Sequence, residues 1–344
     1  MRAIVQTGPE SVDVSEREPP AIGPEEARVA VHATGVCGSD AHAYRYHGGY
    51  EWVQLPRVMG HEYAGVVESV GESVTEVEPG DRVVEDPTRR CGQCFQCRNG
   101  QENVCAAFSV KGMHRDGSYA DRTVAHPENL HVVPDGVPLE HAAITEPLSV
   151  AARAVYEQSV LTPGDTALVE GPGPIGVLVA TVADALGADV TVSGLGADTA
   201  YRLPLVERLG IDAVNLDETD LGTVTAEATD GVGFDVVFDT TGHRSGIETA
   251  VERVRKGGQI VVVGLPGEAS EVALSDLVRS EVQVETSYGS VWRDFERALS
   301  LLDAGTVAAA EIVDTSFSPA DPETAFETFL DSETCKPVFT FAAE

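Results

Sequence analysis

Residues 166–176 of this 344-residue chain read Thr-Ala-Leu-Val-Glu-Gly-Pro-Gly-Pro-Ile-Gly. The pattern Gly-x-Gly-x-x-Gly is weak alone, but here it follows a predicted strand at Thr166–Glu170 and opens a predicted helix at Ile175–Leu186. In that context glycines permit a tight turn, close approach of a pyrophosphate to the backbone, and close helix–strand contact. The sequence therefore predicts a dinucleotide-binding loop formed by Gly171, Gly173, Pro174, Ile175 and Gly176.

Strand-like and helix-like segments alternate from about Ala151 onward. Three further strands and one helix are predicted at Asp189–Ser193, Asp235–Asp239, Gln259–Val263 and around Leu203–Leu209. Parallel βαβ units are the economical explanation of such alternation. The pattern fades near residues 287–289, so we expect residues 151–289 to form an α/β domain with a doubly wound parallel sheet.

The flanking segments have a different pattern. Short β-like runs separated by turns fill the first 150 residues, as at Arg28–His32, Tyr63–Val70 and Asp81–Val84. Beyond residue 289 lie an amphipathic helix at Trp292–Leu302 and an apolar strand at Pro337–Phe341. We expect this tail to return to the first segment, so that residues 1–150 and 290–344 form one β-rich domain.

Charge and hydropathy exclude several classes of protein. The chain has 56 Asp and Glu against 23 Lys and Arg, a net charge of −33, which should repel nucleic acids and anionic membranes. No apolar run approaches the ~18 residues that span a bilayer, and residues 1–7 predict a strand rather than a signal peptide. We expect a soluble cytoplasmic protein that binds neither nucleic acid nor membrane.

Lysine is rare: only Lys111, Lys256 and Lys336 occur, so 20 of the 23 basic residues are arginine. An ordinary acidic protein would keep more lysine on its surface. The composition favours adaptation to multimolar salt, where a Debye length of roughly 3 Å at 1 M screens the self-repulsion.

Four of the six cysteines lie within 15 residues: Cys91, Cys94, Cys97 and Cys105. Tetrahedral zinc takes four such ligands, and two-residue spacings let successive thiolates turn back onto one ion. Disulfides are disfavoured in a cytosolic chain, and an iron–sulfur cluster, which uses similar spacings, is the other alternative. The pattern predicts a structural zinc ion.

A second group of possible metal ligands is spread along the chain. Cys37 follows a predicted strand, His61-Glu62 precedes another, and Glu146 lies just before the domain junction. One thiolate, one imidazole and one or two carboxylates make a plausible zinc site with room for water or substrate. Taken singly, each residue has an ordinary explanation, such as a turn histidine or an acid at a helix start.

In combination, these residues resemble the zinc-dependent medium-chain dehydrogenases, particularly the sorbitol (polyol) and threonine dehydrogenase branch. The resemblance covers nearly the whole chain. It rests on residues 37–40 (Cys-Gly-Ser-Asp), 60–65 (Gly-His-Glu-Tyr-Ala-Gly), 79–83 (Pro-Gly-Asp-Arg-Val), the four-cysteine segment, 146–150 (Glu-Pro-Leu-Ser-Val) and 171–176. It implies a GroES-like β-rich catalytic domain, a Rossmann domain and an active site in the cleft between them.

The resemblance also implies roles for single residues. Catalytic zinc would be bound by Cys37, His61 and Glu146, with Glu62 as a fourth or exchanging ligand. Asp40 would orient the zinc-bound histidine, Ser39 would take the alcohol proton, and His42 would pass it to solvent. Two zinc ions per chain and a nicotinamide cofactor follow.

The choice between NAD and NADP depends on the end of the second strand of the predicted sheet, where an acid normally binds the ribose 2′-hydroxyl. Gly194 occupies that position here, and Asp198 lies several residues past the strand. Ser193 and Arg202 could instead receive a 2′-phosphate, although a similar arginine occurs in NAD-dependent relatives. This gives a weak preference for NADP.

The resemblance favours oxidation of a secondary alcohol of a polyol or sugar. A threonine-type 3-dehydrogenase is the alternative, because Tyr44, Tyr46 and Trp52 also resemble that branch. A non-catalytic zinc-binding protein is a remote third possibility. A homodimer or homotetramer is implied only by the resemblance.

Overall fold

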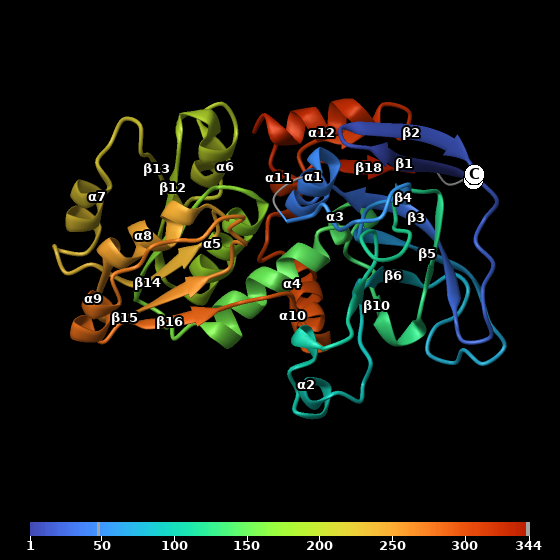
Figure 1. Cartoon of the computed structure of the whole chain (residues 1–344), viewed down its shortest axis with the longest axis horizontal. Helices are drawn as coiled ribbons and strands as arrows, with labels where there is room; N and C mark the ends of the chain where they lie inside the picture. The colour runs from blue at the N-terminus through green and yellow to red at the C-terminus, as the bar shows by residue number, and fades with distance from the viewer. Residues whose placement is uncertain (47–48, 342–344) are drawn as a thin grey trace.

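Two large sheets organise the computed structural model, which describes residues 1–46 and 49–341 (Figure 1). One sheet is six-stranded and wholly parallel. Its strands, in spatial order, are β13 (Asp212–Asn215), β12 (Asp189–Gly194), β11 (Thr166–Glu170), β14 (Phe234–Asp239), β15 (Val254–Val262) and β16 (Gln283–Thr286). The order reverses direction between β11 and β14, which is where doubly wound sheets bind ligands at the carboxyl ends of their strands.

Helices connect these strands: α5 (Pro174–Leu186), α6 (Arg202–Arg208), α7 (Leu221–Ala228), α8 (Arg244–Arg253) and α9 (Leu274–Ser280). The predicted doubly wound parallel sheet is therefore confirmed. β15 begins earlier than the predicted Gln259, because Val254 already pairs with Phe234 ahead of a register shift. The domain boundaries at 150/151 and 289/290 stay a prediction.

The second large sheet is mostly antiparallel. Its strands are β10 (Leu130–Val132), β6 (Arg82–Glu85), β5 (Glu62–Val70), β3 (Ala27–Gly35), β18 (Val338–Thr340) and β17 (Ser316–Phe317), with β9 (Arg122–Ala125) also paired to β3. In β18, Val338 pairs with Gly35 and Thr340 with Ala33. The C-terminal strand thus returns to the N-terminal region, as the sequence predicted.

Smaller elements complete this half of the molecule. A three-stranded sheet has the order β2 (Ser11–Glu16), β1 (Arg2–Gly8) and β4 (Arg57–Val58), and β7 (Thr88–Arg89) pairs with β8 (Ser109–Val110). The helices here are α1 (Gly38–Arg45), α2 (Phe95–Arg98), α3 (Leu139–Ala142), α4 (Thr145–Arg153), α10 (Trp292–Asp303), α11 (Ala309–Ile312) and α12 (Pro322–Leu330).

Helices α4 and α10 join the two halves (Figure 1). One hydrophobic cluster runs from Ala64 of β5 through Leu148 and Phe295 of these helices to Val169 of β11. This continuous core holds the carboxyl edge of the parallel sheet beside the β-rich half. Among the described residues, none of the helices has the length and apolar character needed to cross a membrane.

Candidate active site

Three of the predicted zinc ligands meet at one point. Cys37 caps the N-terminus of α1, while His61 and Glu62 lie at the start of β5. One ligand atom from each lies within 4.8 Å of the others. A thiolate, an imidazole and a carboxylate at this separation can hold a zinc ion and leave a position for water or substrate.

Asp40 lies directly behind this group. Its carboxylate is wholly buried, and Oδ1 lies 3.4 Å from His61 Nδ1, which leaves Nε2 as the ring nitrogen for a metal. Oδ2 accepts hydrogen bonds from Tyr119 Oη at 2.7 Å and from the Cys37 backbone N–H at 3.3 Å. Burial alone would raise the pKa of Asp40, but His61 and these donors outweigh burial and lower it.

Glu62 is buried against a cation that the sequence analysis did not identify. Lys336 Nζ donates to Glu62 Oε1 at 2.7 Å and to Oε2 at 2.5 Å, and also to the Val36 carbonyl oxygen at 3.1 Å. Burial lowers the pKa of Lys336, but the charge of Glu62 outweighs it, so the pKa is raised and the lysine stays charged. Both Glu62 oxygens therefore accept from Lys336, and a zinc ion bound by Glu62 would share its carboxylate with this cation.

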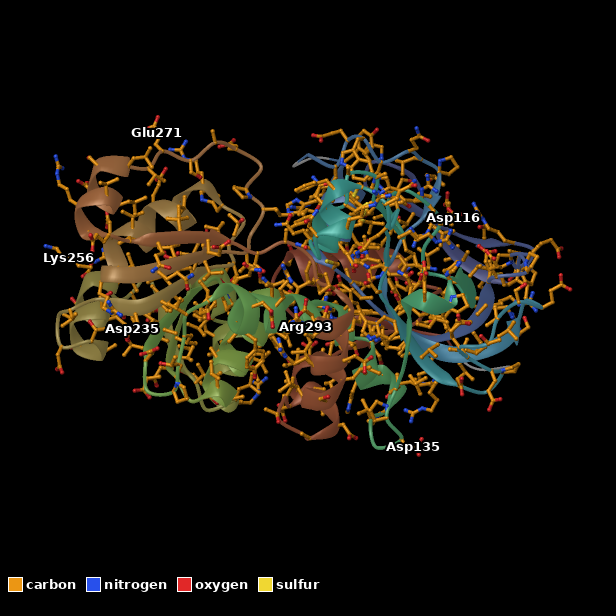
Figure 2. All side chains as sticks on the ribbon, turned by 90° about the horizontal axis from the view of Figure 1, so that it is seen from below. Asp116, Asp135, Asp235, Lys256, Glu271 and Arg293 are labelled. Carbon is orange, nitrogen blue, oxygen red and sulfur yellow. The ribbon has the colours of Figure 1, made fainter. Side chains whose placement is uncertain are left out.

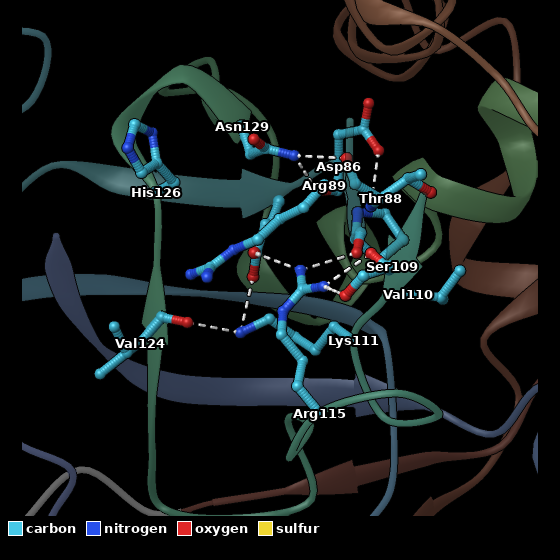
Figure 3. Close-up of polar contacts among 12 residues, drawn as sticks. Asp86, Thr88, Arg89, Ser109, Val110, Lys111, Arg115, Val124, His126 and Asn129 are labelled. Carbon is cyan, nitrogen blue, oxygen red and sulfur yellow. Dashed lines mark hydrogen bonds and ion pairs between the residues drawn. The ribbon is translucent and has the colours of Figure 1, made fainter. Parts of the chain in front are cut away.

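The other two lysines differ from Lys336 in their surroundings. Lys256 is exposed at the outer end of the parallel-sheet half (Figure 2). Lys111 is buried and 2.9 Å from Glu85, and it donates to Thr123 Oγ1 and the Val124 carbonyl oxygen (Figure 3). No predicted metal ligand takes part in the Lys111 pair, which makes it a natural control for Lys336.

Glu146 lies in the first turn of α4 and is half-buried. Burial raises its pKa to about 7, while the charges of His61 and Glu62 act in opposite directions. Its carboxylate is not part of the group of ligand atoms that lie within 4.8 Å of one another. Its role as a zinc ligand stays a prediction.

The predicted proton path begins beside Cys37. Ser39 is half-buried in the first turn of α1, and His42 is exposed one turn later. The His42 ring is stacked on Tyr50, with centroids 5.8 Å apart. Burial raises the pKa of Tyr50 to about 12, and the nearby Cys37 adds to the rise, so its hydroxyl remains a proton donor.

The aromatic residues that resemble the threonine dehydrogenase branch lie in different surroundings. Tyr44 is buried in the core, stacked on Phe326 with centroids 4.6 Å apart, and so cannot line a pocket. Trp52 is 49% exposed and packs against His114. Tyr50, which the sequence analysis missed, faces the charges of Cys37 and His61 and is a better candidate.

The four-cysteine segment forms a second cluster with all four sulfur atoms within 4.8 Å of one another. Sulfur–sulfur distances are 3.4 Å for Cys94–Cys97, 3.5 Å for Cys91–Cys105 and 3.9 Å for Cys94–Cys105. Four thiolates ~2.3 Å from one tetrahedral ion would lie about 3.8 Å apart. Backbone N–H groups, first that of Cys97, lower the pKa of the Cys94 thiol to about 6. The cluster suits one zinc ion, and the described cysteines form no disulfide.

The glycine loop has the expected geometry. Gly171 has a φ of +94°, which favours glycine, and Gly173 caps α5 with Pro174 in its first turn. A Cβ on Gly176 would overlap the Gly171 carbonyl oxygen. The helix start is therefore open to a pyrophosphate, which its backbone N–H groups and dipole would favour.

A cavity of about 200 Å³ lies between α1 and the start of α5. Its lining includes His42 and Arg45 of α1, Pro174 of α5, and Arg202 of α6. The helix that begins at Cys37 thus faces the start of the dinucleotide-binding helix. Arg45, a cation in this lining, was not identified from the sequence because it belongs to none of the quoted motifs.

Arg202 has partners other than the expected 2′-phosphate. Its Nε donates to the Thr334 carbonyl oxygen at 3.0 Å and its Nη2 to that of Phe329 at 2.9 Å. Nη1 lies 3.6 Å from Asp198 Oδ1. Ser193 is buried, and its carbonyl oxygen accepts from the Gly171 N–H at 2.9 Å. The structure therefore gives no support to Ser193 and Arg202 as phosphate ligands.

Comparison with known proteins agrees with this geometry. Residues 23–135 match the alcohol dehydrogenase GroES-like domain, and residues 174–304 match the zinc-binding dehydrogenase family. The chain belongs to the zinc-containing medium-chain dehydrogenases, and it is an NAD(P)-dependent oxidoreductase of the alcohol and polyol class. A GroES-like N-terminal domain with a Rossmann sheet is thereby confirmed, and a non-catalytic zinc-binding protein is excluded.

Three relatives illustrate the range of the family. Sorbitol dehydrogenase of Halalkalibacterium halodurans is 35% identical over 345 residues, covering 99% of both chains. L-threonine 3-dehydrogenase of Saccharopolyspora erythraea is 32% identical and covers 95% of both. The rspB alcohol dehydrogenase of E. coli CFT073, solved with NADH, superposes with a TM-score of 0.91 at 31% identity over 99% of both chains.

Proposed function

We propose that this chain oxidises a secondary alcohol of a polyol or sugar. The observation that carries the proposal is the cavity between two helices: α1, which is capped by the predicted ligand Cys37, lines it together with Pro174 at the start of the dinucleotide-binding helix. A zinc ion at the Cys37 group would act as Lewis acid on the alcohol oxygen, and nicotinamide would accept the hydride. Similarity to sorbitol dehydrogenase supports the substrate class.

In this proposal Cys37 and His61 bind the zinc ion, with Glu146 or Glu62 as the carboxylate ligand. Asp40 holds the His61 ring in the tautomer that leaves Nε2 available. Ser39 would relay the alcohol proton, accepting it as its own hydroxyl proton moves on, and His42, exposed at the cavity wall, would pass a proton to solvent. The four cysteines Cys91, Cys94, Cys97 and Cys105 bind the second, structural zinc ion.

The substrate test is nicotinamide reduction by the zinc-loaded protein with xylitol, sorbitol, glucose and L-threonine, each with NAD and NADP. Turnover of polyols or glucose, and none of threonine, is the expected result. Turnover of threonine alone would favour the threonine-type alternative, which the relative from Saccharopolyspora erythraea supports. The assay is run in low and in multimolar KCl, because adaptation to salt stays a prediction from the composition. The cytoplasmic location also stays a prediction.

A homodimer or homotetramer is also proposed. Its support is the edge strand β16, whose four residues Gln283–Thr286 are all exposed. Leu274 and Val278 of the neighbouring α9 are 70% and 75% exposed. An unpaired edge beside exposed apolar side chains favours pairing with another chain. Sedimentation velocity should show no monomer at assay concentration, and a Val284→Lys change in β16 should release it.

A further inference from the structure

The carboxyl end of β12 indicates how this chain distinguishes its two possible cofactors. In doubly wound sheets an acid at this strand end binds the ribose 2′-hydroxyl of NAD, whereas a nearby arginine accommodates the 2′-phosphate of NADP. Here the strand ends in Ser193 and Gly194, so it supplies neither an acid nor an arginine.

Position 194 has no room for a side chain. A Cβ built on Gly194 lies 2.9 Å from Pro172 Cγ and 3.0 Å from Leu203 Cδ2. Pro172 belongs to the glycine loop and Leu203 to the buried side of α6, so a side chain at residue 194 would have to displace packed atoms on both sides. An acid at residue 194 is sterically disfavoured, and a carboxylate at this strand end has to come from another segment.

The neighbouring strand supplies such a carboxylate. Gly194 pairs with Asn215, the last residue of β13, and its carbonyl oxygen accepts from the Leu216 N–H at 2.9 Å. The next residue, Asp217, is exposed, and its Oδ2 accepts from the Gly196 N–H at 2.8 Å. A Cβ on Gly196 would lie 2.7 Å from that oxygen, so the absence of a side chain at 196 permits this contact.

The nitrogens of Arg202 in α6 are engaged by other acceptors. Arg202 donates to the Thr334 and Phe329 carbonyl oxygens, and its remaining nitrogen faces Asp198. Asp198 itself accepts from the Leu195 N–H at 3.1 Å, so its carboxylate is held inside the loop. Asp217 is the exposed carboxylate that contacts the segment after the strand end.

We propose that Asp217 makes this chain select NAD over NADP. The carboxylate accepts the ribose 2′-hydroxyl of NAD and repels the 2′-phosphate of NADP, because like charges brought together disfavour the wrong ligand. This reverses the weak preference for NADP that Ser193 and Arg202 suggested. The inference rests on the proposed function, since it requires a dinucleotide at the glycine loop.

The test uses two probes that carry only the adenosine half: adenosine 5′-monophosphate and adenosine 2′,5′-bisphosphate. Calorimetric titration of the zinc-loaded protein should show at least about tenfold tighter binding of the monophosphate. Asp217→Asn keeps the shape of the side chain and an oxygen that can accept from the Gly196 N–H. It should reduce the affinity ratio of monophosphate to bisphosphate about tenfold. Asp212→Asn removes the same charge from the opposite end of β13 and should leave the ratio unchanged.

Two results would overturn the proposal: a wild-type protein that binds the bisphosphate as tightly as the monophosphate, or an Asp217→Asn ratio equal to that of wild type. A second variant, Gly196→Ala, displaces Asp217 without changing charge and should also narrow the ratio. NADH binding, measured by its fluorescence, distinguishes a wrong role for Asp217 from a wrong dinucleotide site. If NADH binds but the ratio is insensitive to Asp217, only the role of Asp217 is wrong; if neither probe nor NADH binds, the proposed cofactor site is wrong as well.

Discussion

The two cysteine-containing clusters are built in opposite ways. The four-cysteine cluster comes from a single segment, Cys91–Cys105, whose sulfur atoms already lie within 4.8 Å of one another. The mixed cluster joins Cys37 to His61 and Glu62 from a separate strand, and a second layer, Asp40 and Lys336, is packed behind it. The ligand atoms of the four-cysteine cluster are therefore brought together by one loop, whereas those of the mixed cluster are brought together only by the folded β-rich half of the molecule. This difference predicts separate roles, stability for the first and chemistry for the second.

The comparison is tested most strongly by removing one thiol from each cluster. Cys37→Ser should abolish turnover, a loss of at least about 10³-fold, because the residue is expected to ligate the metal that polarises the alcohol. Its melting temperature should change little. Cys94→Ser should instead lower the melting temperature strongly, since structural zinc contributes directly to folding free energy. Steady-state kinetics and thermal unfolding of both variants provide the two readouts.

Reversed effects would refute the assignment of roles. Wild-type turnover in Cys37→Ser would show that the mixed cluster is not the reactive site. An unaltered melting temperature in Cys94→Ser would show that the four-cysteine lobe does not need its metal.

The second layer of the mixed cluster is tested by Asp40→Asn. The amide keeps the shape but loses the charge beside His61 Nδ1, so zinc affinity should fall roughly 10–100-fold. Asp294→Asn is the matched control, because Asp294 is equally buried but pairs with Arg153. Chelator competition should separate the two variants, and equal zinc affinities would contradict a positioning role for Asp40.

The two buried lysines give a third test. Lys336→Met leaves Glu62 without its cation, at a cost to stability of roughly 3–5 kcal/mol, whereas Lys111→Met leaves Glu85 with Arg115 at 3.8 Å and should cost less. Only Lys336→Met frees Glu62 to close the open metal position, so kcat should fall about tenfold in this variant and less than twofold in the other. Both are assayed below their melting temperatures. Equal kcat values would show that Lys336 has a purely structural role.

The buried acid Glu170 has the smallest expected effect. Glu170 ends β11 and is 4% exposed, and its Oε2 has no hydrogen-bond partner. Burial, with Asp239 adding to it, raises its pKa from 4.5 to about 9. The folded state therefore holds a proton that the unfolded state releases, so stability should fall as pH rises from about 4.5 to about 9.

Glu170→Gln should remove this slope and stabilise the protein by roughly 1–3 kcal/mol near pH 9. Unfolding midpoints in denaturant across that pH range provide the measurement, with Glu207→Gln on the exposed side of α6 as control. A variant that keeps the wild-type slope would show that Glu170 is not the group responsible.

Local sequence patterns were sufficient to predict the glycine loop and the four-cysteine cluster, but not the mixed cluster or its buried partners. The Gly171–Gly176 loop and the four cysteines could be predicted because their spacing alone dictates how the backbone must turn. The mixed cluster required the family resemblance, since residues 37 and 61 meet only through pairing of β3 with β5. Lys336 was not predicted, because the apolar run at residues 337–341 predicts a returning strand but does not show that this strand pairs with β3, beside Glu62. Asp217 was missed because it belongs to no motif. Only the pairing of β13 with β12 brings it next to the end of β12.

The most direct test of the account combines zinc content with turnover. The purified protein should contain two zinc ions per chain, and a mild chelator should remove one of them together with alcohol-dependent NAD(P) reduction, while the melting temperature stays nearly unchanged. Adding zinc back should restore turnover. One zinc ion per chain with full activity, or unchanged activity after loss of the labile ion, would contradict the assignment of a catalytic metal to Cys37 and His61.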